Sequence, residues 1–128
     1  MIDICERARD WLEAEGFKDV HVKRLDQFTG KEGIVIRPFP TTTTDHYYDR
    51  STSQTYVYQV TVRRRSEAKA IEDCFAVANT LDGAYLPSKN GSYGFVDQEI
   101  YTEPQEQELE EANFYAWQVR MVATITRD

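Results

Sequence analysis

The chain has 128 residues, 41% of them hydrophobic and 29% charged, a composition typical of one globular domain rather than a disordered segment. Its formal net charge of −7 disfavours tight binding to phosphate backbones or anionic lipid. No apolar run approaches the roughly 18 residues that cross a bilayer, and residues 1–6 lack the basic start and long apolar stretch of a signal peptide. We therefore expect a single domain over residues 1–128, made in a cytosol.

The first half of the chain predicts a helix followed by strands. Asp3 and Glu6 form a capping-box pattern, apolar residues then recur at helical spacing, and Gly16 ends the helix. Alternating or compact apolar runs bounded by Gly and Pro follow, which is typical of strands. The strands are expected over residues 18–25, 33–37 and 54–64.

The second half predicts another helix and two more strands. Ser66 is placed to cap this helix, which Asp82-Gly83 ends. The strands are expected over residues 92–102 and 113–127. The order α-β-β-β-α-β-β predicts a two-layer α+β domain, with both helices on one face of a mainly antiparallel or mixed sheet. The inner face of the second helix is expected to carry Ala68, Ile71, Cys74, Phe75, Ala78 and Leu81.

Both cysteines, Cys5 and Cys74, fall on the apolar faces of the expected helices. Free cysteine behaves as a small buried hydrophobe, and a cytosolic chain is normally reduced. We therefore expect two reduced core thiols, with a disulfide as the alternative. Two cysteines alone cannot make a zinc site.

Two long loops are expected, at about residues 39–53 and 103–112. The first is polar but holds the adjacent aromatics Tyr47 and Tyr48, and loops of this length are often functional. The second is acidic: seven carboxylates and no base lie between Lys89 and Arg120. This acidic stretch is either a solvated, self-repelling loop or a surface for a basic partner.

The candidate contact residues come from these loops and from the basic run that follows the third strand. Tyrosine and arginine are enriched at protein interfaces, although three arginines at a strand end also make surface ion pairs. The candidates are Tyr47, Tyr48, Arg50, Arg63, Arg65, Glu106, Glu108, Glu110 and Glu111.

The sequence carries no catalytic constellation and no cofactor motif. It has no glycine-rich phosphate loop, and Ser92 misses the spacing of a nucleophile elbow by one residue. His46, flanked by Asp45 and Asp49, is the alternative of a metal-dependent enzyme, but its loop offers no rigid support. The other alternative is a small adaptor or regulatory module that binds a basic protein through the two loops.

Several short segments follow one another in a set order along nearly the whole chain. After the short first helix come Ile34-Val35-Ile36-Arg37-Pro38-Phe39-Pro40, Tyr56-Val57-Tyr58-Gln59-Val60-Thr61-Val62, Leu81-Asp82-Gly83, Gly91-Ser92-Tyr93-Gly94-Phe95, Ile100-Tyr101-Thr102-Glu103-Pro104 and the strand from Phe114. This ordered set resembles the tail terminator proteins of long-tailed bacteriophages, including those labelled minor capsid proteins.

The resemblance implies a non-enzymatic structural protein of the virion, located in the tail at the head–tail junction. It implies a ring of identical subunits, usually a hexamer, with the tail tube protein and the head–tail connector protein as partners. It implies no enzymatic activity and no catalytic residues, and DNA would pass through the ring. From the charge and the missing motifs we expect no cofactor, metal, membrane contact or sequence-specific nucleic-acid binding. A ring needs two different complementary surfaces on each subunit.

Overall fold

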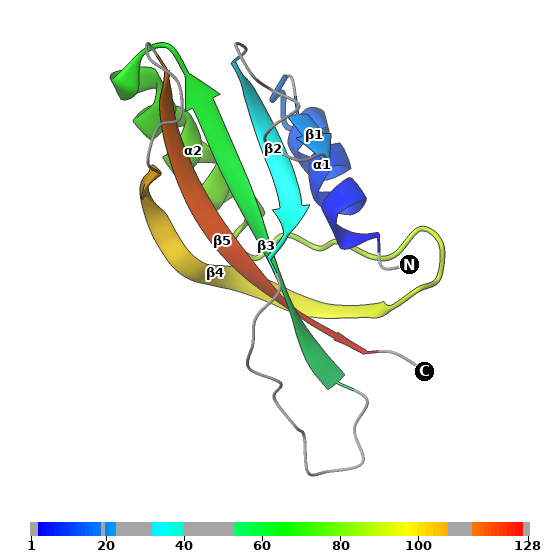
Figure 1. Cartoon of the computed structure of the whole chain (residues 1–128). Helices are drawn as coiled ribbons and strands as arrows, with labels where there is room; N and C mark the ends of the chain where they lie inside the picture. The colour runs from blue at the N-terminus through cyan, green and yellow to red at the C-terminus, as the bar shows by residue number, and fades with distance from the viewer. Residues whose placement is uncertain (1–2, 19, 23–31, 40–52, 108–113, 127–128) are drawn as a thin grey trace.

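The computed structural model describes residues 3–18, 20–22, 32–39, 53–107 and 114–126. These residues form two helices and a five-stranded mixed sheet in the order α-β-β-β-α-β-β. Both helices lie on the same face of the sheet (Figure 1), so the predicted two-layer α+β fold is confirmed. The elements are α1 (Ile4–Ala14), β1 (Val20–Val22), β2 (Gly33–Pro38), β3 (Ser53–Arg64), α2 (Glu67–Leu81), β4 (Gly94–Gln107) and β5 (Tyr115–Thr126).

The strands are arranged in the order β1-β2-β3-β5-β4, so the last strand of the chain lies inside the sheet. β1 runs parallel to β2, and all other neighbours are antiparallel. The central pair β3 and β5 is in register from Ser53↔Thr126 to Arg64↔Tyr115. β4 therefore forms one edge of the sheet, visible as the long curved strand in Figure 1.

The hydrophobic core lies between the helices and the sheet. Tyr58, Val60 and Val62 alternate along β3 and are fully buried, as are Val119 and Met121 on β5. The period-2 pattern of both long strands is confirmed, because alternate residues of a strand point to one face. The helices complete the core with Ile4, Ala8, Leu12, Cys74, Val77, Ala78 and Leu81.

Both cysteines are free and buried, as predicted. Burial raises the pKa of the Cys5 and Cys74 thiols to about 12, because a thiolate is poorly solvated inside the core. Thiols in this state are poor nucleophiles at neutral pH.

The two helix caps differ from each other. Ser66 Oγ accepts a hydrogen bond from the backbone N–H of Lys69 at 3.4 Å, as the sequence predicts for α2. The capping box predicted for α1 is wrong: Asp3 precedes α1, but its side chain makes no capping hydrogen bond. Its carboxylate instead accepts hydrogen bonds from a distant part of the chain, residues 88–92.

The face of α2 that packs on the sheet differs in part from the predicted one. The buried positions are Ala70, Cys74, Val77, Ala78 and Leu81, whereas Phe75 is 44% exposed. Phe75 follows the buried Cys74, and one residue turns a helix by about 100°, which carries its ring to the edge of the interface. There it contacts Trp117 with a ring-centroid separation of 6.5 Å.

The predicted start of the acidic loop at residue 103 is wrong, because these residues still belong to a strand. β4 continues through Gln107, and Gln105, Glu106 and Gln107 are paired with Gln118, Trp117 and Ala116 of β5. Glutamate and glutamine have weak strand propensity, but backbone pairing with a long neighbouring strand overrides it.

Among the described residues, no helix is both long and apolar enough to span a membrane.

Candidate protein-contact site

Arg63 and Arg65, two of the predicted contact residues, stack on one aromatic ring. The guanidinium carbon Cζ lies 4.9 Å from the ring centroid of Phe114 for Arg63 and 5.2 Å for Arg65. Phe114 is buried, whereas Arg65 is exposed. Stacking on an aromatic face holds a guanidinium group in place. We call Arg63 and Arg65 on Phe114 the arginine pair.

The strand register places Glu106 at the same end of the sheet. Arg63 is opposite Ala116 on β5, which in turn is opposite Gln107, the neighbour of Glu106 on β4. Glu106 is exposed and pairs with Trp117. Trp117 is opposite the buried Val62, so Glu106 lies on the face of the sheet that carries the helices, whereas Arg63, one residue further along β3, points to the other face. The other candidates, Tyr47, Tyr48, Arg50, Glu108, Glu110 and Glu111, lie outside the described residues, as does the Asp45-His46-Asp49 cluster.

The face of the sheet away from the helices carries a polar network that was not among the predicted sites. Arg120 Cζ lies 3.8 Å from the centroid of Phe39, and Arg120 Nε donates to Gln59 Oε1 at 3.2 Å. Gln59 Nε2 donates to Thr61 Oγ1 at 3.2 Å, and that hydroxyl donates to Gln107 at 3.4 Å. Gln59 and Thr61 are only 1% and 2% exposed. The network joins β3, β5 and β4 on this face, and its only sequence signal was the run of polar residues at alternate positions of β3.

The exposed edge strand β4 carries apolar side chains that were not among the predicted contact residues. Val96 and Tyr101 are 54% and 55% exposed, and each falls at a shift in the β4–β5 register. Tyr85, 61% exposed, packs edge-on against Phe95 at the start of the same strand, with centroids 5.6 Å apart. Three of the four exposed large hydrophobic side chains of the described residues therefore lie on or against this edge.

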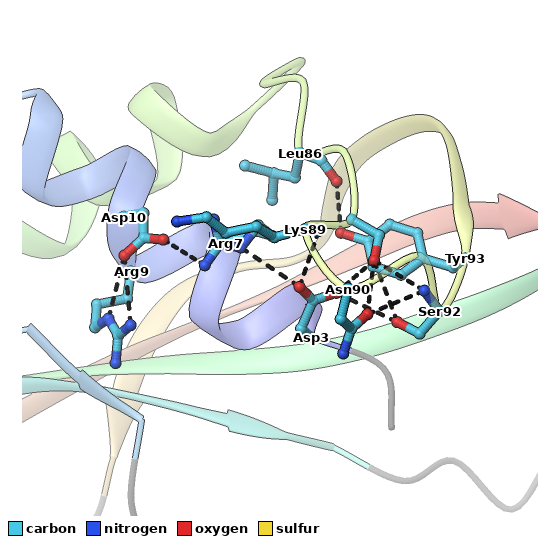
Figure 2. A network of polar contacts seen from close by, with 10 residues as sticks. Asp3, Arg7, Arg9, Asp10, Leu86, Lys89, Asn90, Ser92 and Tyr93 are labelled. Carbon is cyan, nitrogen blue, oxygen red and sulfur yellow. Dashed lines mark hydrogen bonds and ion pairs between the residues drawn. The ribbon is translucent and has the colours of Figure 1, made fainter.

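A second polar network ties the start of α1 to the loop before β4 (Figure 2). Asp3 Oδ1 accepts from Ser88 Oγ at 2.8 Å and from Ser92 Oγ at 3.3 Å, and Asp3 Oδ2 accepts from the Lys89 N–H at 3.0 Å. Arg7 also forms ion pairs, with Nε 3.6 Å from Asp3 Oδ2 and Nη2 2.6 Å from Asp10 Oδ2. Ser92, considered above as a nucleophile, thus has a structural role as a hydrogen-bond donor to Asp3.

Two opposing effects act on the Asp3 carboxyl. Burial alone would raise its pKa, because the charged form loses hydration. The hydrogen bonds from Ser88, Lys89 and Ser92 stabilise the carboxylate and together outweigh burial, so the pKa lies below its usual value of 3.8. The carboxylate is therefore the form that holds this network together.

Two hollows of the described surface are lined in part by charged groups that are paired within the chain. One, of about 400 Å³, lies beside Trp11 and Tyr85, and its charged groups Arg7 and Asp10 are paired with each other. Another, of about 350 Å³, contains Asp73, which pairs with Arg64 at 2.8 Å. The described residues contain no group of three or more His, Cys, Asp or Glu side chains placed to hold a metal ion. The arrangement is that of a small two-layer α+β domain with charged and aromatic side chains on its described surface.

Comparison with known protein families shows which family the chain belongs to. Residues 13–127 match the family described as bacteriophage tail terminator protein. The chain belongs to this family, and its place is in the tail of the virion, as the sequence resemblance predicted. A search of curated proteins gave no match.

Solved structures show the same fold. A chain from a structure named as the virion of a native gene transfer agent particle superposes with a TM-score of 0.70 at 15% sequence identity, covering 96% of this chain and 94% of that one. A second structure gives a TM-score of 0.51 at 16% identity, covering 96% of this chain and 90% of that one. At these identities the likeness concerns the fold alone.

Proposed function

We propose that this protein forms a ring of identical subunits, a hexamer in the simplest case, that caps the end of the tail tube and joins it to the head. The observation that carries the proposal is the family match over residues 13–127. The partners are then a second copy of the chain, the tail tube protein and the head–tail connector protein.

The distribution of surface groups supports a cyclic assembly. A closed ring uses a heterologous contact, in which two different patches of one subunit meet the opposite patches of its neighbours. The arginine pair and the exposed edge of β4 are two such patches of different chemistry. The predicted contact residues Tyr47, Tyr48, Arg50, Glu106, Glu108, Glu110 and Glu111 belong to the same proposal, as candidate contacts to other protein subunits.

The role is structural rather than enzymatic. Arg7 and Asp10 in one hollow and Arg64 and Asp73 in the other form ion pairs, and both thiols are buried and protonated at neutral pH. The protein acts as one domain without cofactor, metal or membrane contact. DNA passes through the ring without sequence-specific binding, because a subunit with a net charge of −7 does not hold the phosphate backbone tightly.

The test combines sedimentation of the purified protein with electron microscopy of polymerising tail tubes. We expect a concentration-dependent ring, or a ring seated on tube ends, and tubes that stop growing when the protein is added. A protein that stays monomeric at high concentration and leaves tube ends bare would refute the proposal. If it instead captured a basic regulatory protein and no tail component, the adaptor alternative would replace it.

A further inference from the structure

The edge strand β4 combines exposed apolar and acidic side chains over a short stretch. Val96 and Tyr101 are exposed at shifts of the β4–β5 register, and Asp97 and Glu99 between them are exposed as well. Bulges redirect side chains and are common where a strand edge has a specific task. We call Val96, Asp97, Glu99 and Tyr101 the edge patch.

The form of β4 disfavours a partner that simply extends the sheet. The strand is 14 residues long, but its register with β5 shifts at three places, and Pro104 lacks a backbone donor. Bulges, proline and charge are the features that protect a sheet edge from pairing with another strand. A partner at this edge therefore binds through side chains, and the acidic groups require that partner to be basic.

Within one subunit, the edge patch is too far from the arginine pair to be its partner. Glu99 is opposite Val122 of β5, whereas Arg63 is opposite Ala116 of the same strand. Six residues of strand separate these two positions, about 20 Å at 3.4 Å per residue. The ion pairs between described residues also involve none of the β4 carboxylates. The two patches can meet only between different copies of the chain.

We infer that the edge patch of one subunit docks on the arginine pair of the next subunit in the ring. Arg65 is exposed and held against Phe114, so its guanidinium group is ordered before it meets Glu99 or Asp97 of the neighbour. Tyr101 and Val96 supply the apolar area around these charge pairs, an arrangement typical of interface anchors. The inference rests on the proposed ring and assigns the two surfaces that close it.

The test uses two charge reversals, Glu99→Arg on the edge patch and Arg65→Glu on the arginine pair. Each variant alone places like charges against each other at every subunit contact, so we expect its self-association to weaken at least tenfold. An equimolar mixture restores opposite charges at every contact, provided that the two variants alternate around the ring. We therefore expect the mixture to form rings again, with an even number of subunits by native mass spectrometry.

Glu72→Arg is the matched control, because Glu72 is an exposed carboxylate on the helix layer rather than on β4. It should assemble like the unmodified protein, and circular dichroism should show that all variants are folded. Rings that survive either single reversal, or a mixture that fails to restore them, would overturn the docking inference while leaving the ring itself intact. An unmodified protein that forms no ring even with tail tubes would contradict the proposed function instead.

Discussion

At the scale of single residues, a few buried polar groups hold the two layers of the fold together. Tyr58 donates its hydroxyl to Gln98 Oε1 at 2.7 Å, and Gln98 Nε2 donates to the carbonyl of Leu81 at the end of α2. Both side chains are buried, so each of these groups depends on its protein partner. The same burial raises the pKa of Tyr58 well above 10, which keeps its hydroxyl in the donor form.

The variant Tyr58→Phe is expected to lower the free energy of unfolding by about 1–2 kcal/mol, because it leaves Gln98 Oε1 buried without its donor. Urea unfolding measures the difference. Tyr115→Phe removes the same hydroxyl from a half-buried position on β5 and should change stability by less than about 0.5 kcal/mol. Equal effects of the two substitutions would show that the buried hydrogen bond does not stabilise the fold.

The Asp3 network predicts a dependence on pH. Since the pKa of Asp3 is lowered in the folded state, its contribution to stability is present above the unfolded value and is lost as the pH falls through the folded value. Asp3→Asn should therefore be less stable than the unmodified protein at neutral pH, and the gap should narrow below about pH 4.

Denaturant unfolding at several pH values checks this expectation. The double variant Ser88→Ala/Ser92→Ala removes two donors to the same carboxylate and should flatten the pH dependence in the same way. A gap between Asp3→Asn and the unmodified protein that persists unchanged in acid would contradict the assignment.

At the scale of elements, β4 shows how pairing overrides composition. A stretch rich in Glu and Gln would be a loop by propensity, yet β4 extends to Gln107 because β5 offers a continuous partner for its backbone. The pairing begins at Gly94, which lies directly against Thr126 of β5. A Cβ atom at Gly94 would overlap Thr126 Oγ1, but the next nearest atoms of Thr126 are 3.8 and 3.9 Å away, so rotation of the Thr126 side chain would make room for it.

We accordingly expect Gly94→Ala to lower the free energy of unfolding by at most about 1 kcal/mol, through the displaced side chain of Thr126. Gly94→Ala/Thr126→Ala removes the overlapping hydroxyl and should recover most of the loss, which a double-mutant cycle measures. Additive losses in the double variant would mean that the clash is not the cause.

At the scale of the whole molecule, the charge of the protein is unevenly placed. The chain has 22 acidic and 15 basic residues, but the net charge of −7 conceals an exposed acidic edge on β4 and an arginine pair about 20 Å away along the sheet. Opposite charges on separate parts of one surface favour head-to-tail association of identical subunits. The ring proposed above is the closed form of that association.

The sequence alone determined the identity and order of the elements, most of the core and the family. These features depend on residues that are near neighbours in the chain: the alternation along β3 and β5, the helical spacing in α1 and the cap at Ser66. Hydrophobic periodicity and helix capping are local properties, so a single sequence is enough to predict the elements that depend on them.

Only the tertiary structure decided where the surface groups meet. Part of the acidic stretch forms the edge strand β4. The Asp3 side chain accepts a hydrogen bond from Ser88 instead of capping α1, and Arg65 stacks on Phe114. Each outcome depends on a pairing between residues that are dozens of positions apart, such as 3 with 88 and 65 with 114. Such pairings are set by strand order and register, which no local pattern in the sequence encodes.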